Sequence, residues 1–389
     1  MKYDFDEIID RSDISVKYCT PTLLHPGCTV PKEYIPMWIA DMDFKCCEKI
    51  LYAIKTRIDR GTLGYEAPAN FRYRNAICNW YQKRYNWKFD TESIITCNGA
   101  IDGLRLAVLA LTKPNQGIII QRPVYGPFSI TIENNNRRII NNALIYDNGN
   151  YFINFEDLEK KASDPETVML AFCNPHNPAA RVWTENELKK VYDICDRHNV
   201  IIVSDEVHGD ITRKEYTYTP MGKISRKNVI TNISMGKTFG LTGLHLANMI
   251  IEDEKIRQKI LNTRGRSNPS PLAATASIAA YEECEEWVNQ INTYLDESFK
   301  IVAEALPTVL PKAKLIQPEG SFLAWINMSA YNLTQEQLSH YFVEIAGVIP
   351  DPGTHFGPEG DGFIRLNIAC PHSILKKALD NIKNSFKML

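Results

Sequence analysis

The chain has 389 residues, of which 44% are hydrophobic and 23% charged, and its formal net charge is −2. This length predicts a large domain with a smaller one, and this composition is typical of a folded globular protein. The small net charge, without a dense basic run, argues against nucleic acid or an anionic membrane as a partner.

Ten cysteines occur, but we expect them to be reduced. Residues 1–7 are acidic and lack the apolar core of a signal peptide. No apolar run approaches the ~20 residues needed to span a bilayer. No Cys-x-x-Cys pair occurs, and no second ligand pair is spaced to join Cys46 and Cys47 in a metal site. We therefore expect a cytoplasmic protein with mostly buried thiols and no metal.

The first part of the chain is rich in turns. Residues 1–45 lead to the sequence Trp38-Ile39-Ala40-Asp41-Met42-Asp43-Phe44. A helix-like stretch follows at about 46–60, then the loop 61–68, then a helix that ends at about Tyr85.

From residue 94 onwards, short apolar runs alternate with helical patterns. The runs that predict strands are 94–97, 117–121, 168–173, 200–204, 229–233 and 246–251. Helices are expected over 100–111 and 184–198, the second opened by the capping-box spacing of Thr184 and Glu187. Strands that are apolar throughout and separated by helices indicate a mainly parallel sheet covered on both faces. We expect a three-layer α/β domain over 46–287.

The carboxyl-terminal part has a different pattern. It predicts helices over 288–305, 335–346 and 373–387, with apolar strand-like runs at 322–326 and 363–369. This order is typical of a smaller α+β domain, which we expect to be formed by residues 288–389 together with 1–45.

Residues that follow the predicted strands are the candidates for a site, because ligands of open α/β sheets lie at the carboxyl ends of the strands. Gly99-Ala100-Ile101 opens a helix, and its free N–H groups suit a phosphate, although an ordinary strand–helix turn has the same composition. Tyr125 follows the next strand beside two prolines, where packing alone would also explain it. Asn177 lies in a turn with two Asn-Pro steps, and its amide can donate to a ligand oxygen. A plain turn is the alternative there.

Two charged residues complete this series. Asp205 directly follows an apolar strand, so its desolvation calls for a cation partner unless it caps the next segment. Lys237 lies in the small-residue turn 234–243, where a partly dry pocket would lower its pKa and make it able to form a Schiff base. An ordinary lysine in a glycine-rich loop is the alternative. Pyridoxal 5′-phosphate needs a lysine, a carboxylate beside its ring nitrogen and phosphate donors, and all of them come to one sheet edge.

The order of these motifs resembles a known family. Gly99-Ala100-Ile101, Tyr125, Asn177-Pro178, Asp205-Glu206-x-His208 and Ser234-x-x-Lys237-Thr238-Phe239 are similar to the class I/II aminotransferases of fold-type I. Residues 38–44, 63–65, 204–208 and 365–371 resemble the branch of cystathionine β-lyase and cystalysin-like C–S lyases. The resemblance runs nearly end to end.

The resemblance implies a role for each matching residue. Lys237 would be the Schiff-base lysine and the acid and base at Cα, Asp205 would pair with the pyridine nitrogen, and Tyr125 would stack on the ring. The remaining implied residues are Asn177 at the phenolic oxygen, His208 in the cofactor site, Ala100, Ile101 and Ser234 at the phosphate, and Tyr65 from the other subunit of a homodimer.

Arg365 would bind the substrate α-carboxylate. Ile364, Leu366 and Ile368 alternate on one face of the strand, which leaves Arg365 and Asn367 on the other. An isolated arginine on an open strand face is otherwise usually solvated.

Two departures from the aminotransferase pattern favour the lyase branch. His245 stands where many aminotransferases have a phosphate-binding arginine, and His208 stands where they often have a tyrosine. A third departure, Ala180 where a glycine is common, concerns only the shape of the loop after Asn177-Pro178. The implied function is pyridoxal phosphate-dependent β-elimination on cystathionine or a related L-cysteine S-conjugate, giving a thiol, pyruvate and ammonia. The alternatives are an aminotransferase, which would need an α-keto acid, and a cofactor-binding regulatory protein with weak lyase activity.

Overall fold

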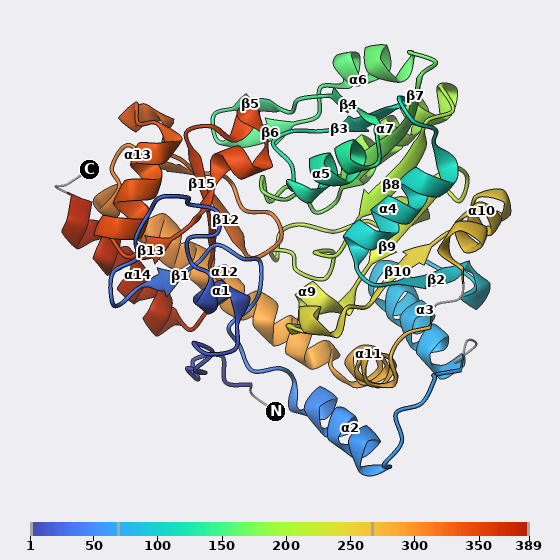
Figure 1. The fold of residues 1–389 in the computed structure, drawn as a ribbon, viewed down its shortest axis with the longest axis horizontal. Coiled ribbons are helices and arrows are strands. Elements are labelled where there is room, and N and C mark those ends of the chain that lie inside the picture. Colours follow the sequence, from blue (N-terminus) through green and yellow to red (C-terminus); the bar gives the residue numbers. More distant parts are fainter. Residues whose placement is uncertain (1–2, 68–70, 266–267, 387–389) are drawn as a thin grey trace.

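The computed structural model describes residues 3–67, 71–265 and 268–386, and two separate β-sheets organise them (Figure 1). The larger sheet has seven strands in the order β2-β10-β9-β8-β7-β3-β4. They are β2 (Ile94–Cys97), β3 (Gly117–Ile120), β4 (Arg138–Asn141), β7 (Thr167–Cys173), β8 (Ile201–Asp205), β9 (Val229–Ile233) and β10 (Ala247–Ile250). Only the pairings of β10 are antiparallel within this sheet of the described chain. The predicted mainly parallel sheet is confirmed.

Helices cover both faces of the large sheet, which is why its strands are apolar throughout. Ile118, Met169 and Val203 pack with α4 (Ala100–Leu111), α5 (Pro127–Asn134) and α10 (Glu254–Arg264). Their strand neighbours Ile119, Leu170 and Ile202 point to the opposite face, where α6 (Phe155–Ala162) and α7 (Glu185–Arg197) lie. The three predicted layers follow from this alternation. Thr184 and Glu187 form the predicted capping box at the start of α7.

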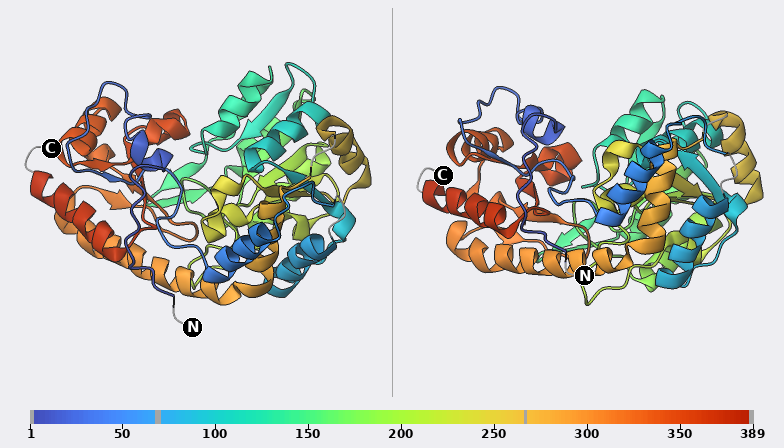
Figure 2. Two further views of the ribbon diagram at one scale, coloured as in Figure 1. Left: turned by 60° about the horizontal axis from the view of Figure 1, so that its bottom comes forward. Right: turned by 90° about the horizontal axis from the view of Figure 1, so that it is seen from below.

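The smaller sheet consists of β11 (Lys314–Leu315), β12 (Leu323–Asn327), β15 (Phe363–Asn367) and β14 (Asp351–Pro352), all paired antiparallel. The long helix α12 (Glu285–Val309) and α14 (His372–Ser385) share its core. Figure 2 shows α12 running along one side of the molecule from the large sheet to the small one. It crosses the proposed domain boundary at residue 288.

Part of the amino-terminal segment packs against the smaller sheet. β1 (Ile35–Pro36) pairs in parallel with β13 (Val348–Ile349), and Ile35 and Met37 lie in the core of the small sheet. α13 (Gln335–Ser339) is shorter than predicted, because the chain continues as a π-helical segment over His340–Ile345.

Several elements were not predicted from the sequence. Among them are β4, the hairpin of β5 (Ile145–Asp147) and β6 (Asn150–Phe152), and the helices α5, α6, α10 and α11 (Pro271–Glu283). The hairpin is largely exposed and so lacks the apolar run that marks a buried strand. The predicted helices before residue 94 are α2 (Glu48–Asp59) and α3 (Phe71–Tyr85). Pro68 of the predicted loop and residue 387 of the predicted last helix lie outside the described residues.

The remaining expectations concern disulfides, membrane-spanning helices and metal sites. All ten cysteines are free. No helix in the described part of the chain has the length and hydropathy to cross a membrane. No cluster of three or more histidine, cysteine or acidic side chains within the described ranges could hold a metal ion.

Candidate active site

Lys237 lies on the short helix α9 (Met235–Phe239), directly after β9. Its Nζ donates to the main-chain oxygen of Ala40 at 2.6 Å. Burial is the main cause that lowers the pKa of Lys237 to about 8. The negative charges of Asp41 and Asp205 oppose this fall, and the positive charge of Arg365 adds to it. Because this pKa is close to neutral pH, the amine is partly uncharged and can act as a nucleophile and base.

Ser234 forms the amino-terminal cap of this helix. Its Oγ accepts from the N–H of Gly236 at 3.0 Å and donates to the carbonyl oxygen of Leu246 at 2.8 Å. Gly240 ends the helix with φ of 68°, a conformation that glycine adopts without strain. The cap fixes the position of Lys237, and the hydroxyl proton of Ser234 is engaged by Leu246 rather than free for a phosphate.

Asp205 is the last residue of β8 and is 8% exposed. Among the described residues, its carboxylate receives a single hydrogen bond, from the N–H of Val207 at 3.3 Å. Burial raises the pKa of Asp205 to about 6, opposed by this hydrogen bond and by Lys237. A buried carboxylate with so few donors fits a protonated pyridine nitrogen as its partner.

The start of α4 provides the candidate phosphate site. The N–H groups of Ala100 and Ile101 lie in its first turn, where no acceptor exists within the helix. Gly103 brings this helix close to β9, because a Cβ at Gly103 would lie 2.9 Å from Oδ1 of Asn232. Asn232 also donates to the carbonyl oxygen of Ala100 at 3.3 Å. The helix start is therefore held against the strand that leads to the lysine.

Three further predicted residues of the cofactor site are Asn177, Tyr125 and His208. The N–H of Tyr125 donates to the carbonyl oxygen of Asn177 at 3.1 Å. Nδ1 of His208 lies 3.1 Å from Oγ of Ser321, and burial, with Lys237 and Arg365 adding to it, lowers the pKa of His208 to about 3. His208 is therefore a neutral polar group at physiological pH.

Arg365 is at the centre of β15 and only 2% exposed. Its Nη1 donates to Oδ1 of Asn177 at 3.0 Å, and its Nη2 donates to the carbonyl oxygen of Trp38 at 2.7 Å. Nη2 also pairs with Oδ2 of Asp351 at 2.5 Å. Nε is buried and has no hydrogen-bond partner among the described residues, so this guanidinium retains an unused donor that a bound carboxylate can satisfy.

The structure thus brings most of the predicted site residues together. The electrostatic influences on their pKa values link four of them: Lys237, Asp205, His208 and Arg365. The charges of Arg365 and Asp205 also act on the pKa of Tyr125. Tyr65 is the exception. It lies in the loop between α2 and α3 and is fully exposed, with a relative exposure of 102%.

The sequence interpretation missed Asp351 and the main-chain oxygens of Trp38 and Ala40. Asp351 stands between two prolines after an apolar strand, a context in which a buried acid is unusual. That pattern could have marked Asp351 as a candidate site residue. The roles of the two oxygens carry no side-chain signal, because any residue type supplies a carbonyl group.

Comparisons with known proteins point to one family. The family model described as aminotransferase class I and II matches residues 32–382. Cystathionine β-lyase PatB of Bacillus subtilis strain 168 is 38% identical over 355 residues, which cover 90% of this chain and 92% of that protein.

Two solved structures are similar over almost their whole length. Cystalysin of Treponema denticola, which contains pyridoxal 5′-phosphate, has a TM-score of 0.96 at 32% identity and covers 100% of both chains. The cofactor-bound C–S lyase of Staphylococcus hominis, complexed with L-cycloserine, has a TM-score of 0.93 at 34% identity, with 99% of this chain and 98% of that one covered.

Proposed function

The chain belongs to the family of class I and II aminotransferases, and on this premise we propose that it is a pyridoxal phosphate-dependent C–S β-lyase. Its substrate is cystathionine or a related L-cysteine S-conjugate, and its products are a thiol, pyruvate and ammonia. The observation that carries the proposal is the meeting of a partly buried lysine amine, a donor-poor buried carboxylate and a buried arginine with an N–H that no described residue accepts.

The residues present fit the cofactor. Asp205 would face the ring nitrogen, Tyr125 the ring, and the amide nitrogen of Asn177 the phenolic oxygen, since the amide oxygen already accepts from Arg365. The residues proposed at the phosphate are Ala100, Ile101 and Ser234, with His208 beside the ring. For Ser234 to donate to the phosphate, its hydroxyl would have to give up its hydrogen bond to the carbonyl oxygen of Leu246.

When bound, pyridoxal phosphate supplies an electron sink for the bond that breaks at Cα. Arg365 holds the substrate carboxylate and thereby turns Cα toward Lys237. The released amine of Lys237 takes the proton from Cα, which its lowered pKa permits near neutral pH. Loss of this proton allows the β-thiol to leave.

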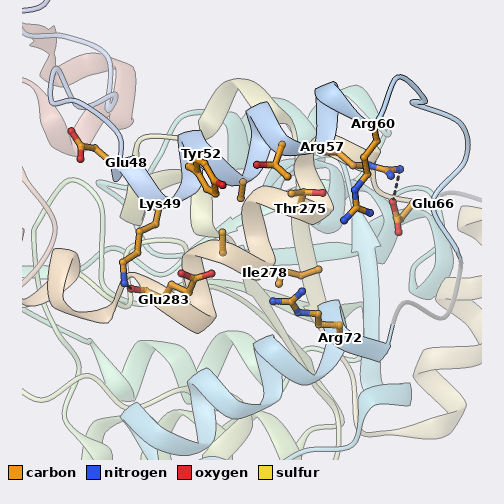
Figure 3. Close-up of a pocket in the computed structure, with 13 residues that line it drawn as sticks. Glu48, Lys49, Tyr52, Arg57, Arg60, Glu66, Arg72, Thr275, Ile278 and Glu283 are labelled. Atoms are coloured by element: carbon orange, nitrogen blue, oxygen red, sulfur yellow. Dashed lines mark hydrogen bonds and ion pairs between the residues drawn. The ribbon is translucent and has the colours of Figure 1, made fainter.

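We propose a homodimer in which Tyr65 reaches the cofactor phosphate of the other subunit. Several large side chains near this loop are exposed, among them Tyr52, Leu63 and Phe71. Of these, Tyr52 lines a groove between α2, α3 and α11, together with Arg57 and Ile278 (Figure 3). Such a cluster is typical of a surface that another protein covers. The ten free thiols support a cytoplasmic location.

The rival activity, transamination, would require an added α-keto acid. At position 245, where many aminotransferases anchor the phosphate with arginine, this chain has an exposed histidine. The test is pyruvate release from L-cystathionine with no keto acid supplied, with Lys237→Ala as the inactive control. We expect pyruvate and thiol in equal amounts. Turnover that appears only with a keto acid would favour the aminotransferase, and no turnover with any S-conjugate would favour a binding or regulatory protein.

A further inference from the structure

Residues 37–43 form a segment of main chain that we call the carbonyl strap, because its successive oxygens bind the groups of the active site. The oxygen of Trp38 accepts from Arg365 and that of Ala40 accepts from Lys237. Nδ2 of Asn367 donates to the oxygens of both Ile39 and Asp41, each at 2.7 Å. The strap therefore links the substrate-binding arginine to the catalytic lysine.

The strap is held by two cations from the amino-terminal segment. Arg11 forms ion pairs with both Asp41 and Asp43, and its Nη1 also donates to the carbonyl oxygen of Met42 at 2.8 Å. Lys17, 1% exposed, pairs with Oδ2 of Asp43 at 2.5 Å. A guanidinium that binds two carboxylates and a carbonyl restrains all three groups. Residues of the amino-terminal segment thus act on the site through their charges, although Arg11 and Lys17 bind the strap rather than Lys237 itself.

The hydrogen bond from Lys237 to Ala40 shows where the strap can hold the amine of this lysine. In the proposed reaction, this amine is released when the amine of a substrate takes its place on the cofactor. We propose that Asp41, held by Arg11, is a positioning residue that keeps the released amine of Lys237 at the carbonyl of Ala40 and sets its charge. This inference rests on the proposed role of Lys237.

The charges around the amine determine the direction in which its pKa should shift. The charges that act on the amine are those of Asp41 in the strap, Asp205 at the end of β8 and Arg365 in β15. His208, on which the charge of Lys237 acts in turn, is neutral. Burial is the largest influence and lowers the pKa of Lys237, while Asp41 is the strongest influence that raises it. Removing the Asp41 charge should therefore lower this pKa. Removing Arg11 should raise it, because the Asp41 carboxylate is then no longer neutralised.

The test measures the titration of Lys237 in the full-length protein after the cofactor has been removed with hydroxylamine. The amine is labelled by reductive methylation in short pulses at a series of pH values, and the peptide that contains Lys237 is quantified by mass spectrometry. The variants are Asp41→Asn and Arg11→Gln. Glu7→Gln is the matched control, because it breaks the exposed pair of Glu7 and Lys45 in the same amino-terminal part of the chain.

We expect the labelling midpoint of the native chain near pH 8. Asp41→Asn should lower it by about one pH unit, Arg11→Gln should raise it, and Glu7→Gln should leave it unchanged. Shifts in opposite directions identify charge setting, because a loosened site would move both variants in the same direction. Equal midpoints, or shifts of the same sign, would overturn the proposal. If one variant fails to fold, the sign of the other decides. The result is independent of whether the protein cleaves cystathionine.

Discussion

Nη1 of Arg365 and Oδ1 of Asn177 are 3.0 Å apart, and this hydrogen bond joins the centre of the small sheet to the loop after β7 of the large sheet. The two residues are separated by 188 positions in the chain. The bond places the proposed carboxylate-binding group beside a proposed cofactor ligand. A substrate held by Arg365 therefore has its Cα in a fixed relation to the place where the cofactor would lie.

Replacing Arg365 with lysine should impair substrate binding while keeping the buried positive charge for Asp351. Lysine lacks the planar fork of arginine, so we expect KM for L-cystathionine to rise about 10- to 100-fold, the cost of one or two charged hydrogen bonds. Steady-state kinetics measure this rise. Arg257→Lys on α10 is the control, because the guanidinium of Arg257 binds only the carbonyl oxygens of Ile251 and Glu252 among the described residues. An unchanged KM in Arg365→Lys would rule out the proposed role.

Asp205→Asn should stabilise the cofactor-free protein and slow catalysis. Burial raises the pKa of Asp205 from 3.8 to about 6, so the folded state favours the neutral acid. Its contribution to stability is fully present below about pH 4 and is lost as the pH rises through 6. At pH 8 the asparagine variant should therefore unfold with a free energy higher by on the order of 2 kcal/mol, and at pH 4 the difference should vanish. Urea denaturation at both pH values measures this.

Cofactor should reverse the order of stability of these two proteins. The carboxylate of Asp205 gains a cationic partner when the ring nitrogen is protonated, whereas an asparagine gains only a neutral hydrogen bond. With pyridoxal phosphate bound, we expect the native chain to be the more stable of the two and the variant to lose about 10²–10³-fold in kcat. A native chain that stays less stable with cofactor would show that Asp205 does not face the ring nitrogen.

Mixing two inactive variants should restore activity if Tyr65 acts across a dimer interface. Tyr65→Ala and Lys237→Ala would each inactivate a homodimer. In a mixed dimer, one site combines the native lysine of one chain with the native tyrosine of the other. We expect pyruvate formation to recover to about one quarter of the native rate after the chains are unfolded and refolded together. No recovery, despite mixed dimers seen by native mass spectrometry, would place Tyr65 elsewhere.

The large sheet and its edge could be predicted because their determinants are local. Each buried strand is an apolar run, and parallel strands bring their carboxyl ends to one edge whatever their order in the sheet. Asp205 at the end of β8, Lys237 after β9 and Asn177 after β7 therefore had to lie near one another. The order of the strands, with β10 antiparallel between β2 and β9, had no comparable signal in the sequence.

The contacts that tune the site could not be predicted, because they join distant segments through main-chain atoms and ion pairs. Ala40 is 197 positions from Lys237, and Trp38 is 327 positions from Arg365. Alternation along β15 indicated that Arg365 lies on the strand face opposite the apolar side chains. It could not indicate that Asp351 and Trp38 fill that face and bury the guanidinium.

The central claim is that the amine of Lys237 carries the cofactor, and borohydride reduction tests it most directly. The purified chain is incubated with pyridoxal phosphate, reduced and digested, and its peptides are mapped by mass spectrometry. We predict one reduced pyridoxyl adduct, on Lys237, with loss of the visible absorbance and of pyruvate-forming activity. An adduct on another lysine, or none despite excess cofactor, would contradict the account.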